Sequence, residues 1–465
     1  SIAGAIATEH KGKDAFQEVD QEKLFMPITK KTFSIDQTKN ITVELNKAMQ
    51  LAKNGKWGPV HVNIPRDILS GNESFESFTF ENETNETKEK NINKNDLEKV
   101  ISLIEKATKP IIICGAGIKN SNSQDEVISL SKSLNIPLVS SAGHGDVIPF
   151  DCDLYAGQMG PRGNKVASYL ANHADLILAI GTRLGFNSTF YSYDNISKSA
   201  KIVQVDIDPI ALGRYFPIEL GINNDAKKFL ENLSSLIIHK KFNHNNSVWV
   251  NNFYSEKKKY YKNRDNEADT NSKIIQPSGL FKELREILPK NSSVTLDAGT
   301  LCLQATDQFY FSKPKSLFTP LDFGLVGFSF ACGLGIKVAK PNKTVVSLMG
   351  DGGFGMTISE LSTAVEHGIN TITIVMNNKS WGAEKAYQKD FYGERYLGAD
   401  IQSPPFDEVA KLYGAKGIKV KKLSEVNQAV KSALKTNKPV VIDVDVDPKA
   451  LYSFRRDSFT HRIKK

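Results

Sequence analysis

Two short apolar runs that each lead into a polar residue constrain the fold of this chain most strongly. The first run, residues 345–349, leads into Asp351, and the second, residues 372–376, leads into Asn378. Runs of this length and content are typical of buried parallel strands. The 27 positions that separate Asp351 from Asn378 leave room for a helical crossover, expected at residues 359–367. The pattern predicts a parallel α/β sheet in which neighbouring strands end near Asp351 and Asn378.

The residues at these two strand ends suit a site for a metal and a diphosphate. Open α/β sheets hold their ligands at the carboxyl ends of the strands. Oxygen atoms of Asp351, Asn378 and the Ser380 backbone would suit a Mg²⁺ ion that phosphate oxygens also hold. Glycines would let the backbone approach a diphosphate closely. The glycines of this turn are Gly350, Gly352 and Gly353. The alternative is an ordinary strand–turn–helix with a capping aspartate, which is what a lone Gly-Asp-Gly usually marks.

Composition indicates a globular protein and gives little support to nucleic-acid binding. The chain has 465 residues, enough for about three domains. It is 40% hydrophobic and 24% charged, which is the range of a globular protein. The net charge of +8 comes from lysines that are scattered along the sequence, so we expect attraction of small anions and no nucleic-acid partner.

Cysteine usage and hydropathy favour a cytoplasmic protein. The four cysteines lie far apart and form no Cys-x-x-Cys motif, so neither a disulfide framework nor a thiolate metal site is expected. The four cysteines are Cys114, Cys152, Cys302 and Cys332. The sequence has no run of about 18 apolar residues, so we expect no transmembrane helix and no membrane partner.

Three α/β blocks follow one another along the chain, separated by polar connectors at roughly 71–95 and 239–275. Strand, helix, strand order within each block predicts three doubly wound parallel sheets. Aromatic residues such as Trp249 and Phe253 predict that the second connector contains a packed helix. The first residues already have the character of a domain interior, so the first block is expected to lack an N-terminal segment. The blocks are 1–70, 96–238 and 276–446, followed by a C-terminal tail at 447–465.

Two further glycine-containing loops follow predicted strands. Residues 115–117 form a Gly-x-Gly without the third glycine of a dinucleotide fingerprint, so a structural turn is the favoured interpretation. Residues 297–300 could contact phosphate through backbone amides and the Thr300 hydroxyl, with Gly299 in the same loop. The alternative for this second loop is a small-residue turn at a helix N-terminus.

With these motifs in hand, the chain resembles the acetolactate-synthase branch of thiamine-diphosphate enzymes over nearly its whole length. Residues 14–18 and 27–30 are similar to the pyrimidine-domain segment of that branch. Residues 324–328 resemble the loop that supports the bent cofactor, with Val326 at the supporting position. The resemblance implies that block 1–70 is the C-terminal part of a pyrimidine-binding domain. It also implies a central domain, then a diphosphate-binding domain, with thiamine diphosphate and Mg²⁺ as cofactors.

Within the branch, the chain is similar to the sulfoacetaldehyde acetyltransferases. The similarity rests on residues 63–67, on 381–385 with four residues after them, and on 454–457. It implies conversion of sulfoacetaldehyde and phosphate to acetyl phosphate and sulfite. Two anionic substrates would need cations, for which Lys385, Arg455 and Arg456 are the candidates. Gln17 would line the same pocket from another domain, in a homodimer or homotetramer.

Two other interpretations remain open. One is an acetolactate synthase or related 2-oxoacid decarboxylase, which would release carbon dioxide from pyruvate without phosphate. The other is a catalytically incomplete cofactor-binding fragment. It follows from the family comparison, in which the glutamate that bonds the cofactor's aminopyrimidine would lie before Ser1.

Overall fold

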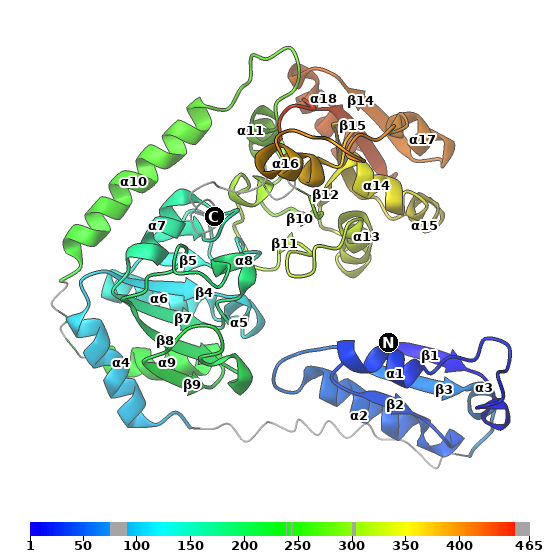
Figure 1. The fold of residues 1–465 in the computed structure, drawn as a ribbon, viewed down its shortest axis with the longest axis horizontal. Coiled ribbons are helices and arrows are strands. Elements are labelled where there is room, and N and C mark those ends of the chain that lie inside the picture. The colour runs from blue at the N-terminus through cyan, green and yellow to red at the C-terminus, as the bar shows by residue number, and fades with distance from the viewer. Residues whose placement is uncertain (75–90, 239, 241, 243–244, 300–303, 452–465) are drawn as a thin grey trace. The chain divides into compact units, whose positions relative to one another are not determined.

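A computed structural model describes most of the chain in two compact units, Ser1–Asn91 and Ile92–Lys465 (Figure 1). The described residues are 1–74, 91–238, 240, 242, 245–299 and 304–451.

The first unit contains a small parallel sheet with strand order β1-β3-β2. Its core is formed by Phe33, Ile35, Val62 and Ile64 of the sheet region together with Ala48 of a helix. The strands are β1 (Ile2–Ala5), β2 (Thr32–Ser34) and β3 (His61–Pro65), and the helices are α1 (Gln21–Phe25), α2 (Ile41–Lys53) and α3 (Arg66–Leu69).

The second unit begins with a six-stranded parallel sheet in the order β6-β5-β4-β7-β8-β9. Every residue of β4 and β7 is buried, as expected for central strands of a parallel sheet with helices on both faces. The strands are β4 (Pro110–Cys114), β5 (Leu138–Ser140), β6 (Tyr155–Gln158), β7 (Leu176–Ile180), β8 (Lys201–Asp206) and β9 (Leu220–Asn223). The helices are α4 (Lys94–Lys106), α5 (Ala116–Asn120), α6 (Gln124–Leu134), α7 (Lys165–His173), α8 (Phe186–Thr189) and α9 (Ala226–Ile237).

A long helix, α10 (Ser247–Asn266), occupies most of the second predicted connector (Figure 1). Trp249 and Phe253 are buried in the core of the preceding sheet, and the Trp249 indole N–H donates to the Pro110 carbonyl at 3.2 Å. The aromatic residues therefore do form a packed helix, as the sequence predicts.

The last sheet is also parallel, in the order β11-β10-β12-β13-β15-β14. Met349 of one predicted strand pairs with Val375 of the other, so these strands are neighbours. The strands are β10 (Ser293–Leu296), β11 (Leu317–Phe318), β12 (Val345–Gly350), β13 (Ile372–Asn377), β14 (Lys416–Val420) and β15 (Val440–Asp445). The helices are α11 (Pro277–Ile287), α13 (Phe328–Ala339), α14 (Asp351–Thr357), α15 (Glu360–Glu366), α16 (Gly382–Phe391), α17 (Phe406–Leu412) and α18 (Leu423–Leu434). The predicted fold class, three parallel sheets with interleaved helices, is confirmed.

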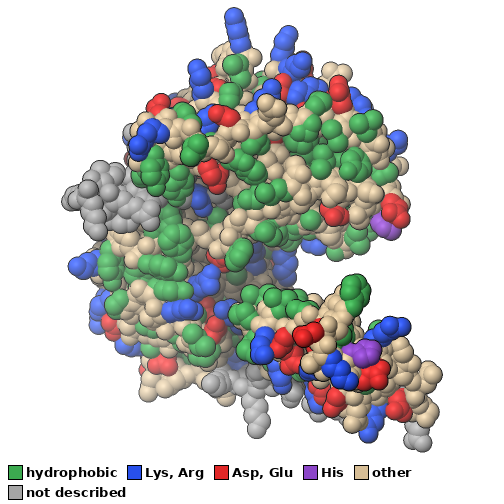
Figure 2. Space-filling model, turned by 45° about the vertical axis from the view of Figure 1, so that its right-hand side comes forward, with side chains coloured by type: hydrophobic (Ala, Val, Ile, Leu, Met, Phe, Trp, Pro, Cys, Tyr) green, Lys and Arg blue, Asp and Glu red, His purple; other side chains and the backbone are tan. Residues whose placement is uncertain are grey.

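Charged side chains are dispersed on the face of the molecule that Figure 2 shows. On the face drawn in Figure 2, Lys and Arg side chains alternate with acidic, apolar and neutral ones. Within the described part of the chain, no helix is both long enough and apolar enough to cross a bilayer.

Candidate cofactor and substrate site

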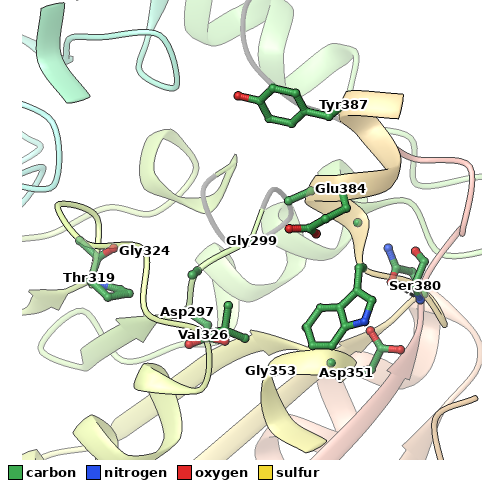
Figure 3. Close-up of a pocket in the computed structure, with 18 of the residues that line it drawn as sticks. Asp297, Gly299, Thr319, Gly324, Val326, Asp351, Gly353, Ser380, Glu384 and Tyr387 are labelled. Carbon is green, nitrogen blue, oxygen red and sulfur yellow. Dashed lines mark hydrogen bonds between the residues drawn. The ribbon is translucent and has the colours of Figure 1, made fainter. Parts of the chain in front are cut away.

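The topology of the last sheet places a crevice between β10 and β12. The chain passes from β10 to β11 on one side and then returns to β12 on the other side, so the connections diverge there. In open α/β sheets, ligands bind at such a switch point, outside the carboxyl ends of the strands. The loops that follow β10 and β12 border a cavity of about 230 Å³ (Figure 3).

The cavity brings together most of the residues that the sequence proposes for cofactor binding. Its walls include Gly299, Val326, Gly350, Asp351, Gly352, Gly353, Asn378 and Ser380. The remaining candidate, Thr300, lies outside the described residues. The structure therefore gathers these residues from four separate segments of the chain, while their role in binding stays a prediction.

Asp351 begins α14 and is buried at the base of the cavity. Its Oδ2 accepts a hydrogen bond from the Ser403 hydroxyl at 2.6 Å. Its Oδ1 is buried and receives no hydrogen bond from any residue that the structure describes. Burial raises the pKa of the Asp351 carboxyl, and the bond from Ser403 partly opposes that shift. A bound cation would stabilise the ionised form of this carboxylate.

Asn378 and Ser380 follow the neighbouring strand, β13, and both are buried. The Asn378 side-chain oxygen accepts a hydrogen bond from the Ser380 backbone N–H at 3.2 Å. This bond orients the side-chain amide of Asn378. The Ser380 hydroxyl is buried and has no hydrogen-bond partner within the described part of the chain. Polar atoms of Asp351 and Ser380 are thus available to a ligand.

These oxygen atoms fit a cation whose coordination is completed by phosphate. Among the described residues there is no group of three or more His, Cys, Asp or Glu side chains that could hold a metal by themselves. One carboxylate and one amide oxygen suit Mg²⁺ because this ion keeps several other oxygen ligands, commonly from phosphates or water. The residues present therefore fit a magnesium–diphosphate group.

Two glycines of α14 allow the close packing of this site. A Cβ atom at Gly352 would lie 2.5 Å from Cζ3 of Trp381, and one at Gly353 would overlap Oδ2 of Asp297. Any side chain at these positions would displace the indole ring or the carboxylate. The glycines are therefore required by steric fit, in addition to any approach of a ligand to the backbone.

Asp297, at the end of β10, fixes the position of the loop that contains Val326. Its carboxylate accepts hydrogen bonds from the backbone amides of Gly327 at 3.0 Å and Ser329 at 3.1 Å. Burial raises the pKa of the Asp297 carboxyl, and these amides oppose the shift. The buried carboxylate thereby holds Val326 at the cavity wall (Figure 3).

The four predicted catalytic residues fall in separate parts of the chain, and their roles stay predictions. Lys385 lies on α16, where its ammonium group pairs with Asp400 and stands 5.2 Å from the Tyr396 ring centre, and it does not line the cavity. Gln17 is exposed in the first unit. Arg455 and Arg456 lie outside the described residues.

Other residues at the cavity were not among the predicted site residues. Glu384 and Tyr387 project from one face of α16 toward the cavity (Figure 3), and their spacing of three residues is a signal that could have found them. Trp381 precedes the same helix and also lines the cavity. Arg162 reaches the cavity from the β6–α7 loop. Its position could not be predicted because it comes from a different sheet.

The Gly-x-Gly of the central block has a structural explanation. The Gly115 amide donates to the Ile180 carbonyl at 3.0 Å, and the Gly117 amide donates to the Gly181 carbonyl at 2.9 Å. A Cβ at Gly115 would overlap the Gly181 carbonyl oxygen. These glycines let the ends of β4 and β7 pack together, which favours the turn interpretation over a dinucleotide loop.

Comparison with protein families identifies the class of enzyme. Residues 297–444 match the C-terminal TPP-binding domain of thiamine pyrophosphate enzymes. Residues 97–233 match the central domain of the same enzymes. The chain therefore belongs to the thiamine pyrophosphate enzyme family, and these domains indicate thiamine diphosphate as its cofactor.

Comparison with individual curated relatives narrows the group of enzymes to which the chain belongs. It is 30% identical over 458 residues to a probable acetolactate synthase large subunit from Methanocaldococcus jannaschii, with 96% of this chain and 76% of that protein covered. It is 28% identical over 485 residues to a sulfoacetaldehyde acetyltransferase from Alcaligenes xylosoxydans xylosoxydans, with 97% and 79% covered. The chain is thus an enzyme of the group that contains acetolactate synthases and sulfoacetaldehyde acetyltransferases.

Proposed function

We propose that this enzyme converts sulfoacetaldehyde and phosphate to acetyl phosphate and sulfite. The observation that carries the proposal concerns the residues that follow Asn378. Trp381 to Glu384 belong to the segment that resembles sulfoacetaldehyde acetyltransferases, and this segment forms one wall of the cavity. A segment at the cavity wall is placed to influence which substrate is accepted.

The proposed reaction needs no external oxidant or reductant. The carbon–sulfur bond breaks and a carbon–oxygen bond to phosphate forms, while the aldehyde carbon is oxidised to the acyl level and its neighbour is reduced to a methyl group. Hydrogensulfite carries away the proton of hydrogenphosphate. When bound, thiamine diphosphate supplies the carbanion stabilisation that such a rearrangement requires. The protein's part is to bind, orient and shield the reacting groups.

Within the same proposal, Asp351, Asn378 and Ser380 hold Mg²⁺ on the cofactor's diphosphate. Asp351 Oδ1 has no partner among the residues that the structure describes, and this supports the assignment because a buried carboxylate oxygen without a partner is unfavourable in the absence of a cation. Gly299, Thr300 and Val326 are proposed to contact the cofactor.

The other assigned roles remain part of the proposal. Lys385, Arg455 and Arg456 are proposed to act on the anionic substrates, and Lys385 would first have to leave Asp400. Gln17 is proposed to act from the pyrimidine-binding domain. We propose that this domain includes 1–70, with the central domain at 96–238 and the diphosphate-binding domain at 276–446. We also propose a cytoplasmic location.

Product analysis tests the substrate. The complete enzyme, supplied with thiamine diphosphate and Mg²⁺, should release sulfite and acetyl phosphate in equal amounts from sulfoacetaldehyde, and only when phosphate is present. Release of carbon dioxide from pyruvate without a need for phosphate, and no sulfite from sulfoacetaldehyde, would show that the proposal is wrong.

That second outcome corresponds to an acetolactate synthase. It is the alternative because several acetolactate synthase large subunits match this chain at 30% to 31% identity, against 28% to 29% for the sulfoacetaldehyde acetyltransferases.

We further propose a homodimer or homotetramer. The first unit exposes several large apolar side chains within a short segment, which is unusual for a surface in contact with water. These exposed apolar side chains are Phe16, Val19, Leu24, Met26 and Ile28. Light scattering on the purified protein should give a mass of two or four chains, and a single chain would refute this part of the proposal.

A further inference from the structure

We propose that Arg162 binds the anionic group of a substrate and is a specificity-determining residue of this enzyme. The inference rests on the proposed function only in requiring that the substrates are small anions. It does not depend on whether the anionic group is a sulfonate, a carboxylate or phosphate.

Charge balance in the cavity points to Arg162. The walls carry the carboxyl groups of Asp297, Asp351 and Glu384. Among the cavity-lining residues that the structure describes, Arg162 is the one with a cationic side chain. An anion that leaves water for this cavity must meet a cation, because a buried charge without a partner is strongly unfavourable. Arg162 is placed to supply that charge.

Lys385 is less suited to this role because it does not line the cavity in the described structure. Its ammonium group pairs there with the carboxylate of Asp400.

The loop that carries Arg162 is held in one conformation by its own hydrogen bonds. The Gly163 amide donates to the Gly160 carbonyl at 2.9 Å, and the Asn164 amide donates to the Gln158 carbonyl at 2.8 Å. The Asn164 side chain also accepts hydrogen bonds from the first turn of α7 and donates to Ala156 at 2.9 Å. Little conformational entropy is therefore lost in placing the backbone of Arg162, which favours a preorganised binding group.

The chemistry of the side chain fits the same ligand class. A guanidinium group presents a planar fork of N–H donors that matches two oxygens of a sulfonate, carboxylate or phosphate, and it stays charged at every physiological pH. The group that Arg162 recognises is therefore an oxyanion with at least two accessible oxygens. Neutral aldehydes of the same size would lack this contact.

Equilibrium binding tests the proposal without requiring turnover. Inorganic phosphate, lactate, an unreactive carboxylate, and 2-hydroxyethanesulfonate, an unreactive sulfonate, are titrated calorimetrically into the complete enzyme loaded with thiamine diphosphate and Mg²⁺. Arg162→Gln should raise the Kd of at least one of these anions by about tenfold or more, since a hydrogen bond to a charged group is lost. Arg162→Lys should recover part of the affinity, and it serves as the second variant if the glutamine protein does not fold.

The matched control is Arg214→Gln, which removes an exposed arginine that lies over the Tyr215 ring and outside the cavity. Its Kd values should equal those of the unmodified enzyme. The Kd of thiamine diphosphate, measured by fluorescence, should change less than about twofold in every variant.

Three results would overturn the inference. One is that the unmodified enzyme binds none of the three anions, and another is that Arg162→Gln leaves all three Kd values unchanged. The third is a weaker affinity for thiamine diphosphate with unchanged anion binding, which would assign Arg162 to the cofactor. Failure of the proposed function is seen separately, as the absence of sulfite from sulfoacetaldehyde. In that case a raised Kd for lactate alone would still support the role of Arg162.

Discussion

At the scale of single residues, the site depends on polar groups that are buried without full compensation by the protein. Asp351 keeps one oxygen unpartnered among the described residues, and burial raises the pKa of its carboxyl. In the cofactor-free protein this group opposes folding as the pH rises from its unfolded pKa of about 3.9 through the raised pKa, because the folded state holds the proton longer. A bound cation would stabilise the ionised carboxylate and so favour the folded state.

The pH dependence of cofactor binding follows from this shift. Mg²⁺ requires the ionised carboxylate, so affinity for thiamine diphosphate in Mg²⁺ should fall as the pH is lowered through the raised pKa of Asp351. Asp351→Asn should weaken binding by at least about 100-fold, because a residue that holds the ion directly should matter more than the surrounding contacts whose loss costs about 10–100-fold, and it should remove the pH dependence that Asp351 causes. Fluorescence titration over a series of acidic to neutral buffers measures both effects. A substituted protein with undiminished, Mg²⁺-dependent affinity would contradict the assignment.

The glycines of α14 offer a prediction with a control in the same helix. Gly353→Ala should destabilise the protein by about 1–3 kcal/mol, because the new methyl group overlaps the Asp297 carboxylate. Gly355→Ala meets no atom within 4 Å and should stabilise the helix by about 0.5–1 kcal/mol. Urea unfolding of both variants measures the difference. Equal changes in the free energy of unfolding would show that overlap with the Asp297 carboxylate does not destabilise the Gly353→Ala protein.

At the scale of elements, α10 is attached to the central sheet by aromatic side chains. Trp249→Ala removes a buried indole and its hydrogen bond to the Pro110 carbonyl, so the free energy of unfolding should fall by about 3–5 kcal/mol. Val248 is the control, because its side chain is 74% exposed on the same helix and its replacement by alanine should change stability by less than about 0.5 kcal/mol. Chemical denaturation followed by circular dichroism compares the two. Similar losses would mean that α10 packs differently.

At the scale of the molecule, the central and C-terminal sheets of the larger unit are joined at Asp146. One oxygen of this buried carboxylate pairs with Lys119 at 2.8 Å, and the other accepts the backbone amides of Ser316 and Leu317 at 3.0 and 3.1 Å. The chain continues directly from β11 into Thr319, which lines the cavity. Asp146 therefore links the central block to the cavity wall.

Asp146→Ala should lower the free energy of unfolding by about 3–5 kcal/mol, because it leaves the nearly buried Lys119 ammonium without its partner. It should also weaken thiamine diphosphate binding. The control, Asp322→Ala, removes an ion pair with Arg183 that joins the same two blocks at the surface, and should cost at most about 1 kcal/mol. Calorimetric unfolding and cofactor titration distinguish the variants, and equal losses would refute the special role of Asp146.

The amino-acid sequence was sufficient to predict the features that depend on local patterns. Apolar runs at 345–349 and 372–376 predicted two neighbouring parallel strands, because such runs are stable only when buried on both faces. The same strands carried Asp351 and Asn378 to one edge of the sheet, since parallel strands end on the same side. Family resemblance added the cofactor, which the matched domains support.

Only the tertiary structure decided which side chains share the cavity. Lys385 was predicted from the sequence to meet an anion, but its ion pair with Asp400, fifteen residues further on, could not be predicted. The spacing of Glu384 and Tyr387 puts them on one face of α16, but which face meets the cavity depends on packing that periodicity does not specify. Arg162 comes from another sheet altogether. Side-chain neighbours of this kind depend on how separate elements pack against each other, and no local pattern contains that information.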